Sequence, residues 1–200
     1  MAAGEAASHV PRARRDRRPL PPRELPLASS VASLRQRAAA GDARAACRLW
    51  EEYTSCALAR DSEASIEALR SQLVQAPQPG GPSLADMLVA ARERVERCKG
   101  VPPSAPWERE RYLAQAAMAG HVPSIVQFAN GSFAQAKPLE NLQTLALYKA
   151  HARRLVEGAA AAGSAEAALM LALAHGSTPW VGLLNRWWSP IRSNPQRSSS

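Results

Sequence analysis

The stretch YLAQAAMAGHVPSIVQFANG, residues 112–131, decides the fold of this 200-residue chain. It reads as a helix that ends at Gly120 and a second helix that begins at once. Closely similar segments surround Gly41, in LRQRAAAGDARAACRLW (34–50), and Gly163, in LVEGAAAAGSAEAALMLAL (155–173). A glycine at a helix end can adopt the left-handed conformation without a Cβ clash. Each segment therefore predicts two antiparallel helices joined by a tight turn.

The three segments have the same residue types at fixed sequence positions relative to the glycine. A large apolar residue stands seven places before it, Ala three places before, a small residue four places after, and a large apolar residue eight places after. The residue directly after the glycine is Asp42, His121 or Ser164, and Asp and Ser cap a following helix well, His less well. The aligned positions are Leu34, Leu113 and Val156; Ala38, Ala117 and Ala160; Ala45, Ser124 and Ala167; and Leu49, Phe128 and Leu171.

A single hairpin cannot bury its apolar face, so hairpins of this kind stack on one another. We therefore predict an all-α fold, an α-solenoid of stacked antiparallel helical hairpins with disordered termini. The repeat domain covers residues 29–188, and its second hairpin lacks the glycine turn. The hairpins are expected near 29–57, 61–98, 106–131 and 151–176, followed by a capping helix at 179–188.

The two ends of the chain differ from its body in charge and composition. The net charge is +8, but residues 1–26 carry six Arg and three acidic residues, and residues 186–200 carry three Arg and no acid. The body is nearly neutral, which argues against a basic binding face on the folded part. The Arg/Pro-rich segment 1–28 and the tail 189–200 have too little apolar material to offset their ordering entropy, so both are predicted to be disordered.

The two clearest segments are AAMAGHVPSIVQFANG and AAAAGSAEAALMLALAHG. They resemble Sel-one-like repeats, which are relatives of the tetratricopeptide repeat, and the resemblance covers about residues 106–176. Met118 stands where the family has an acidic residue. The resemblance implies an adaptor that assembles protein complexes, often in signalling or at the bacterial envelope. The residues that carry it are Leu113, Ala116, Ala117, Gly120, His121, Phe128 and Gly131 in one copy, and Val156, Ala160, Gly163, Ala167, Ala168, Leu171 and Gly176 in the next.

Signals for catalysis are weak. The segment AGSAEA does not follow a strand, as a nucleophile elbow would, and PGGP lacks the lysine and the setting of a phosphate loop. The four His residues show no helical ligand spacing, and the three Cys form no C-x-x-C pair. We predict a non-enzymatic protein with no catalytic residues, cofactor or metal.

The proposed activity is binding of a protein or peptide partner along one face of the stacked hairpins. On the first helix of each hairpin, positions nine and five before the glycine lie opposite the packing residue. They select Gln36, Arg111, Gln115 and Arg154 as partner contacts. The alternative is binding of nucleic acid or an anionic surface through the basic N-terminal arm, which offers phosphate contacts but no aromatic stacking platform.

The terminal stretch WVGLLNRWW places Trp180, Leu183, Leu184 and Trp187 on one helical stripe. Such a stripe fits a capping helix, and also partner docking or contact with a membrane surface. Trp188 falls at the edge of the stripe, which makes it a candidate for exposure and partner contact.

The cysteines allow two interpretations. Cys47, Cys56 and Cys98 are expected to be free and buried, since Cys behaves as a small apolar residue. The alternative is a Cys56–Cys98 disulfide, which implies an oxidising compartment. With no apolar segment that could span a membrane or serve as a signal, the protein is expected to be cytoplasmic by default. The bacterial periplasm or envelope is the alternative if the true start or a signal is missing.

Overall fold

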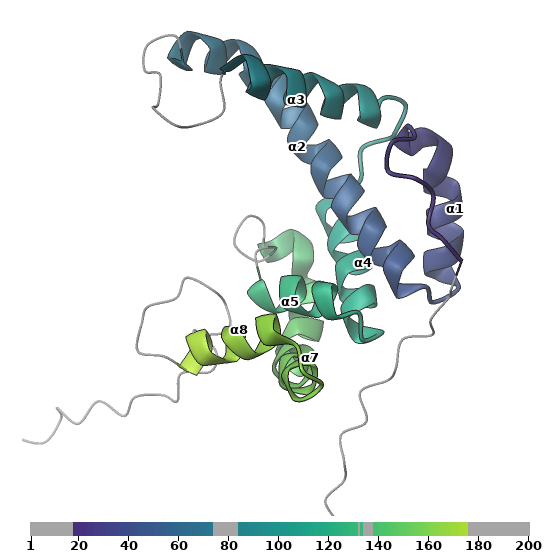
Figure 1. Cartoon of the computed structure of the whole chain (residues 1–200), viewed down its shortest axis with the longest axis vertical. Helices are drawn as coiled ribbons and strands as arrows, with labels where there is room; N and C mark the ends of the chain where they lie inside the picture. The colour runs from purple at the N-terminus through teal and green to yellow at the C-terminus, as the bar shows by residue number, and fades with distance from the viewer. Residues whose placement is uncertain (1–17, 74–83, 132, 134–137, 176–200) are drawn as a thin grey trace, which may run out of the picture. The chain divides into compact units, whose positions relative to one another are not determined.

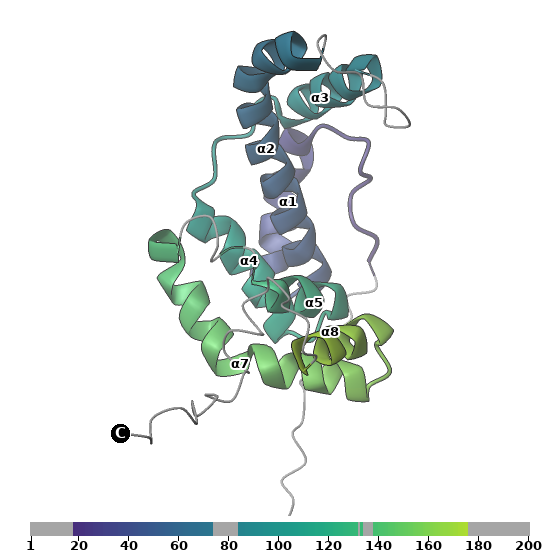
Figure 2. The same cartoon turned by 90° about the vertical axis from the view of Figure 1, so that its left-hand side faces the viewer.

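The computed structural model describes residues 18–73, 84–131, 133 and 138–175. All regular secondary structure within these residues is helical, which confirms the all-α prediction for this part of the chain (Figures 1 and 2). The chain divides into two compact units. We call them the N-terminal unit, which ends at Tyr112, and the C-terminal unit, which begins at Leu113.

The N-terminal unit is organised around one long helix. It contains α1 (Leu27–Ala39), α2 (Ala43–Leu73), α3 (Leu84–Cys98) and the first part of α4 (Pro106–Met118). Helix α2 packs against both α1 and α3 (Figure 1). Helix α3 lies within the hairpin expected at 61–98, and Gly100 just after it takes the left-handed conformation that is common at the C-terminal ends of helices (φ +76°).

The C-terminal unit holds the rest of α4, α5 (Val122–Asn130), the 3-10 turn η1 (Pro138–Asn141), α7 (Leu142–Ala161) and α8 (Ala165–His175). Helix α7 packs against both α5 and α8, and α5 also contacts α8. A helix of the hairpin around Gly120 therefore packs on the hairpin around Gly163, as stacking requires. Continuation of this stack through the whole chain stays a prediction.

The three glycine turns are the same structure. Gly41, Gly120 and Gly163 have φ of +90°, +82° and +95°. In each turn the glycine N–H donates to the carbonyl three residues earlier at 2.9 Å, and the next residue's N–H donates to the carbonyl five residues earlier at 3.0–3.1 Å. This pair of bonds is a Schellman motif, which satisfies carbonyls that a helix end leaves open. The predicted turn is thus confirmed at all three glycines.

Of the residues that follow the three glycines, Asp42 and Ser164 cap the next helix with their side chains and His121 does not, in line with the predicted order. Asp42 Oδ1 accepts hydrogen bonds from the N–H groups of Arg44 and Ala45 at 3.0 and 3.3 Å. The hydroxyl of Ser164 accepts from an N–H of α8 at 3.3 Å. The side chain of His121 makes no such cap; its Nδ1 instead lies 2.9 Å from the hydroxyl oxygen of Ser124.

Most of the aligned positions form the core of the hairpins, although Ala160 in the last hairpin is partly exposed. The residues seven before the glycine are at most 2% exposed, and the small residues four after it are fully buried. Eight places after, Leu49 and Phe128 are fully buried, whereas Leu171 is partly exposed and its neighbour Leu169 is 60% exposed. The difference arises because, within the described residues, only α5 and α7 pack substantially on α8, and its outer face stays open.

Two helices run further than predicted. Helix α2 continues through residues 58–60, where a division between hairpins at 29–57 and 61–98 was expected. Helix α7 begins at Leu142 rather than near residue 151. Neither the stretch 57–65 nor the stretch 142–150 contains a Gly or Pro that would end a helix, and a polar run alone does not break one.

The predicted disordered arm is wrong for its last residues. Leu27 and Ala28 belong to α1, and residues 18–26 are held against the N-terminal unit. The Arg37 guanidinium donates to the carbonyls of Arg18 and Pro19 at 3.0 and 2.7 Å and also binds the Asp42 carboxylate. Residues 1–17, the capping helix expected at 179–188 and the tail 189–200 lie outside the described residues.

Substitution of Gly163 tests the left-handed turn. Gly163→Ala should lower the free energy of unfolding by roughly 1 kcal/mol, because an L-residue with a Cβ is strained at this φ. A Cβ at Gly163 meets no atom within 4 Å, so the cost is conformational rather than steric. Gly163→Asn is the control and should lose less, since Asn tolerates the left-handed region. Urea unfolding of the full chain measures both; equal losses for Ala and Asn would contradict this account.

Tyr148 should make the C-terminal unit less stable to unfolding at alkaline pH. Its ring packs against Phe128 and Phe133 at centroid distances of 5.5 and 5.7 Å, and its hydroxyl donates to the Ala129 carbonyl at 3.0 Å. Burial raises the pKa of Tyr148 well above its ordinary value. The unfolded chain loses this proton near pH 10 while the folded chain keeps it, so stability falls as pH rises above 10. Tyr148→Phe should flatten this fall in unfolding titrations at pH 9–11; an unchanged slope would contradict it.

Candidate functional site

Five side chains on three helices form a continuous series of ring and guanidinium contacts in the N-terminal unit. Arg111 lies over the rings of Trp107 and Tyr112, its Cζ 5.8 and 5.5 Å from their centroids. The Tyr112 ring lies 6.1 Å from that of Tyr53 on α2, and Arg35 on α1 lies over Tyr53 at 5.6 Å. We call this set the arginine–aromatic ladder.

The ladder is buried in the middle and open at the end on α4. Tyr53 and Tyr112 are 1% and 7% exposed, whereas Trp107 is 51% exposed and Arg111 is also exposed. Helix periodicity explains the difference. Tyr112 lies on the stripe of α4 that enters the core, and Trp107 and Arg111 lie four residues apart and share a neighbouring, exposed face.

The two arginines of the ladder have different electrostatic partners. Arg35 pairs with the Glu108 carboxylate at 3.3 Å. Arg111 has no carboxylate partner among the described residues, although two acidic residues are close to it in sequence. Glu108 is engaged by Arg35, and Glu110 lies largely buried beside Trp50 and Arg109. Burial raises the pKa of Glu110, and the interactions with Arg109 and Trp50 partly oppose that rise.

The residues selected from the sequence fall in both units. Gln36 and Arg111 are exposed in the N-terminal unit, and Gln36 lies outside the ladder. Gln115 is partly exposed in the C-terminal unit. Arg154, also in that unit, is exposed, and its Nη2 lies 3.0 Å from His151 Nδ1. Trp188 lies outside the described residues. Of the four that the structure describes, Arg111 is the one placed over aromatic rings.

Sequence reasoning missed Trp107, the largest exposed side chain of the ladder. The signal was present, because Trp107 precedes Arg111 by four residues and so shares its helix face. The contribution of Tyr53 had no such signal, since it comes from another helix and depends on how α2 and α4 pack.

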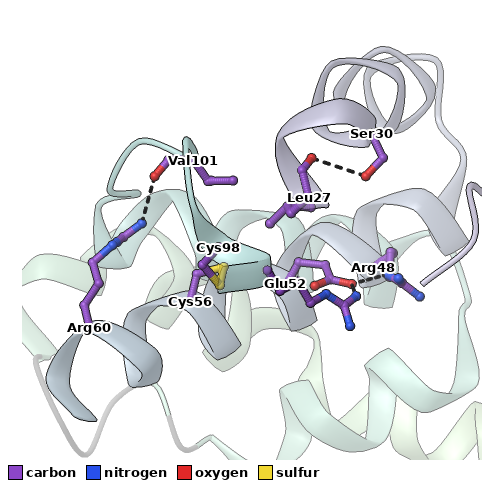
Figure 3. The surroundings of a disulfide bond; sticks show 9 residues. Leu27, Ser30, Arg48, Glu52, Cys56, Arg60, Cys98 and Val101 are labelled. Carbon is purple, nitrogen blue, oxygen red and sulfur yellow. Dashed lines mark hydrogen bonds and ion pairs between the residues drawn. A yellow bond between two sulfur atoms is a disulfide. The ribbon is translucent and has the colours of Figure 1, made fainter. Parts of the chain in front are cut away.

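Cys56 and Cys98 form a disulfide that joins α2 to the end of α3 (Figure 3). Cys47 is free and buried. The expectation of three free thiols is therefore wrong for two of them, and the alternative pairing is the one in the structure. The two cysteines lie 42 residues apart in sequence, and their pairing depends on α3 folding back along α2, with Cα atoms 5.5 Å apart.

A buried ionic cluster lies one helical turn from the disulfide. Glu52, 4% exposed, binds Arg48 on its own helix and Arg97 on α3, each at 2.5 Å (Figure 3 draws the contact with Arg48). Burial lowers the pKa of Arg48, and the attraction of Glu52 partly offsets it. Near the disulfide, Arg60 donates to the Val101 carbonyl at 3.2 Å. The Glu52–Arg97 and Arg60–Val101 contacts thus join α2 to the end of α3 and to the residues just after it, on either side of the covalent bond.

Two further findings bear on the kind of site present. No helix in the described part of the chain is long and apolar enough to cross a membrane. Among residues 18–73, 84–131 and 138–175, no three His, Cys, Asp or Glu side chains are grouped so that they could hold a metal ion.

The chain matches no protein-family model, no curated protein and no solved structure.

Reduction of the disulfide should destabilise the N-terminal unit. Closing a 42-residue loop stabilises the folded state by about 4 kcal/mol on the chain-entropy account. Urea unfolding of the full chain with and without a phosphine reductant measures the loss. Cys56→Ala/Cys98→Ala should show a similar loss and no response to reductant, and Cys47→Ala should keep the full response. A wild-type midpoint unmoved by reductant would contradict the account.

Proposed function

We propose that the protein is a non-enzymatic interaction scaffold, built from Sel-one-like helical hairpins, that binds a protein or peptide partner. Support for the repeat comes from the three identical Schellman turns and from the equivalent buried positions around them. Hairpins that bury one face in the stack present other faces to solvent, and repeat proteins bind their partners on an extended surface built from such exposed faces.

The observation that carries the proposal is the exposed end of the arginine–aromatic ladder. Trp107 is 51% exposed, and the Arg111 guanidinium lies over its ring with Cζ 5.8 Å from the ring centroid. Trp, Tyr and Arg are the residue types that contribute most to protein–protein binding. The stacking contacts restrain Arg111 before a partner arrives, which lowers the entropy lost on binding. We therefore place the partner contact at Trp107 and Arg111 on α4.

The basic arm remains a second candidate with less support. Residues 1–17, which hold four of its arginines, lie outside the described residues. Of the other two, Arg23 is engaged by the Glu51 carboxylate at 2.7 Å. A cation that is already paired gains less from a phosphate contact than a free one, which favours the ladder as the binding site.

The disulfide also bears on where the protein works. Structural disulfides persist in oxidising compartments and are rare in the cytosol. The Cys56–Cys98 bond therefore favours the secretory route or the bacterial envelope over the cytoplasm expected by default. We place the protein in such a compartment as part of this proposal.

Substitution at the ladder should abolish partner capture. Full-length wild type and Trp107→Ala/Arg111→Glu serve as baits in lysate from the native source, with mass spectrometry of the bound proteins. We expect a specific protein that wild type captures to be lost from the variant, because both its aromatic and its charged contact are gone. Thermal unfolding checks that the variant is folded.

The matched control is Leu142→Ala/Arg153→Glu, which changes an exposed apolar residue and an exposed arginine elsewhere. This control should retain the captured protein. Retention by both variants would contradict the proposed contact, and capture of nucleic acid in a salt-sensitive manner would favour the arm instead.

A further inference from the structure

We propose that the partner of the Trp107–Arg111 surface presents a carboxylate beside an apolar side chain, as in an acidic linear peptide motif. This inference rests on the proposed function and names the chemistry of its ligand. It is carried by the geometry and the charge of the exposed end of the ladder.

Arg111 is a positioned guanidinium with free hydrogen-bonding capacity. Its Cζ lies 5.8 Å from the Trp107 ring and 5.5 Å from the Tyr112 ring, so the planar group is restrained by two rings. Stacking uses the face of a guanidinium and leaves its N–H groups directed outward at the edge. A carboxylate matches that edge with two parallel hydrogen bonds.

The surroundings of Arg111 leave its charge without a carboxylate partner among the described residues. The nearest acidic residue on the same side of α4, Glu108, is bound by Arg35 at 3.3 Å. Glu110 points into a largely buried position, where it meets Trp50 and Arg109. An incoming carboxylate therefore does not have to displace an internal ion pair from Arg111.

Trp107 adds the apolar half of the site. Its indole is half exposed directly beside the guanidinium. A large aromatic surface of this kind gains free energy when an apolar side chain covers it. A partner that places an acidic residue and an apolar residue close together satisfies both groups at once.

The same geometry disfavours a polyanion. Nucleic acid binding draws on several cations that neutralise successive phosphates. Here the nearby cations are already engaged, because Arg35 is paired with Glu108 and Arg109 interacts with Glu110, so Arg111 offers one guanidinium and not a row of them. An acidic peptide needs only a single well-placed carboxylate to pair with that guanidinium.

Selection from a random peptide library tests the proposal without knowledge of the partner. A phage-displayed library of 12-residue peptides is panned on the full-length oxidised protein, and binders are then measured against variants by fluorescence anisotropy. Enriched peptides should carry Asp or Glu next to an aromatic or aliphatic residue. Arg111→Gln should weaken them on the order of ten-fold or more. The affinity of Arg111→Lys should lie between those of wild type and Arg111→Gln, since lysine keeps the positive charge but lacks the planar guanidinium edge.

The outcomes separate this inference from the proposed function. Peptides that need Trp107 but carry no acidic residue, or that bind Arg111→Gln as tightly as wild type, overturn the carboxylate inference and leave the interaction site standing. Failure to enrich any peptide, or peptides unaffected by Trp107→Ala, overturns both. Tight binding of a fluorescent oligonucleotide that Arg111→Gln abolishes also overturns both, in favour of a nucleic acid ligand. Arg153→Glu should leave all binding unchanged.

Discussion

The left-handed glycine turn is the constraint on which the rest of the structure depends. An L-residue with a Cβ is strained at the φ of +82° to +95° that Gly41, Gly120 and Gly163 adopt. That conformation lets two N–H groups close onto the carbonyls of the preceding turn and starts the next helix immediately. The direction of each second helix, and hence which side chains face the first, follows from this geometry. Small residues beside the turn then allow close packing, as the full burial of Ala38 and Ala45 shows.

The proposed binding surface is a consequence of the same packing. Helix α4 buries Tyr112 in the N-terminal unit, which leaves Trp107 and Arg111 on a neighbouring, exposed face of the same helix. Tyr112 links the core to the exposed surface, because its buried ring contacts that of Tyr53 and also lies beneath the Arg111 guanidinium. The disulfide and the Glu52 cluster act elsewhere in the unit, where they fix α3 to α2.

The sequence predicted local features well and long-range pairings poorly. The turns, the caps and the burial around Gly41 and Gly120 follow from local rules, so they could be read from residue spacing. The disulfide could not, because it joins residues that are 42 positions apart in sequence. The continuity of α2 did have a local signal, since residues 57–65 contain no Gly or Pro, but the division into hairpins was predicted there instead. For the site, spacing on a single helix selected Arg111 and could also have selected Trp107. The ladder beyond Tyr112 requires knowledge of how α1, α2 and α4 pack.

Amide hydrogen exchange at the three glycine turns tests the central claim most directly. Short peptic peptides that cover residues 37–42, 116–121 and 159–164 of the oxidised full chain report on the N–H groups of each turn. The account predicts slow exchange in all three, because each turn donates two N–H groups to carbonyls of the preceding helix. Exchange at the rate of an unfolded peptide in any one of them would show that its turn does not form the hairpin, and would contradict the repeat.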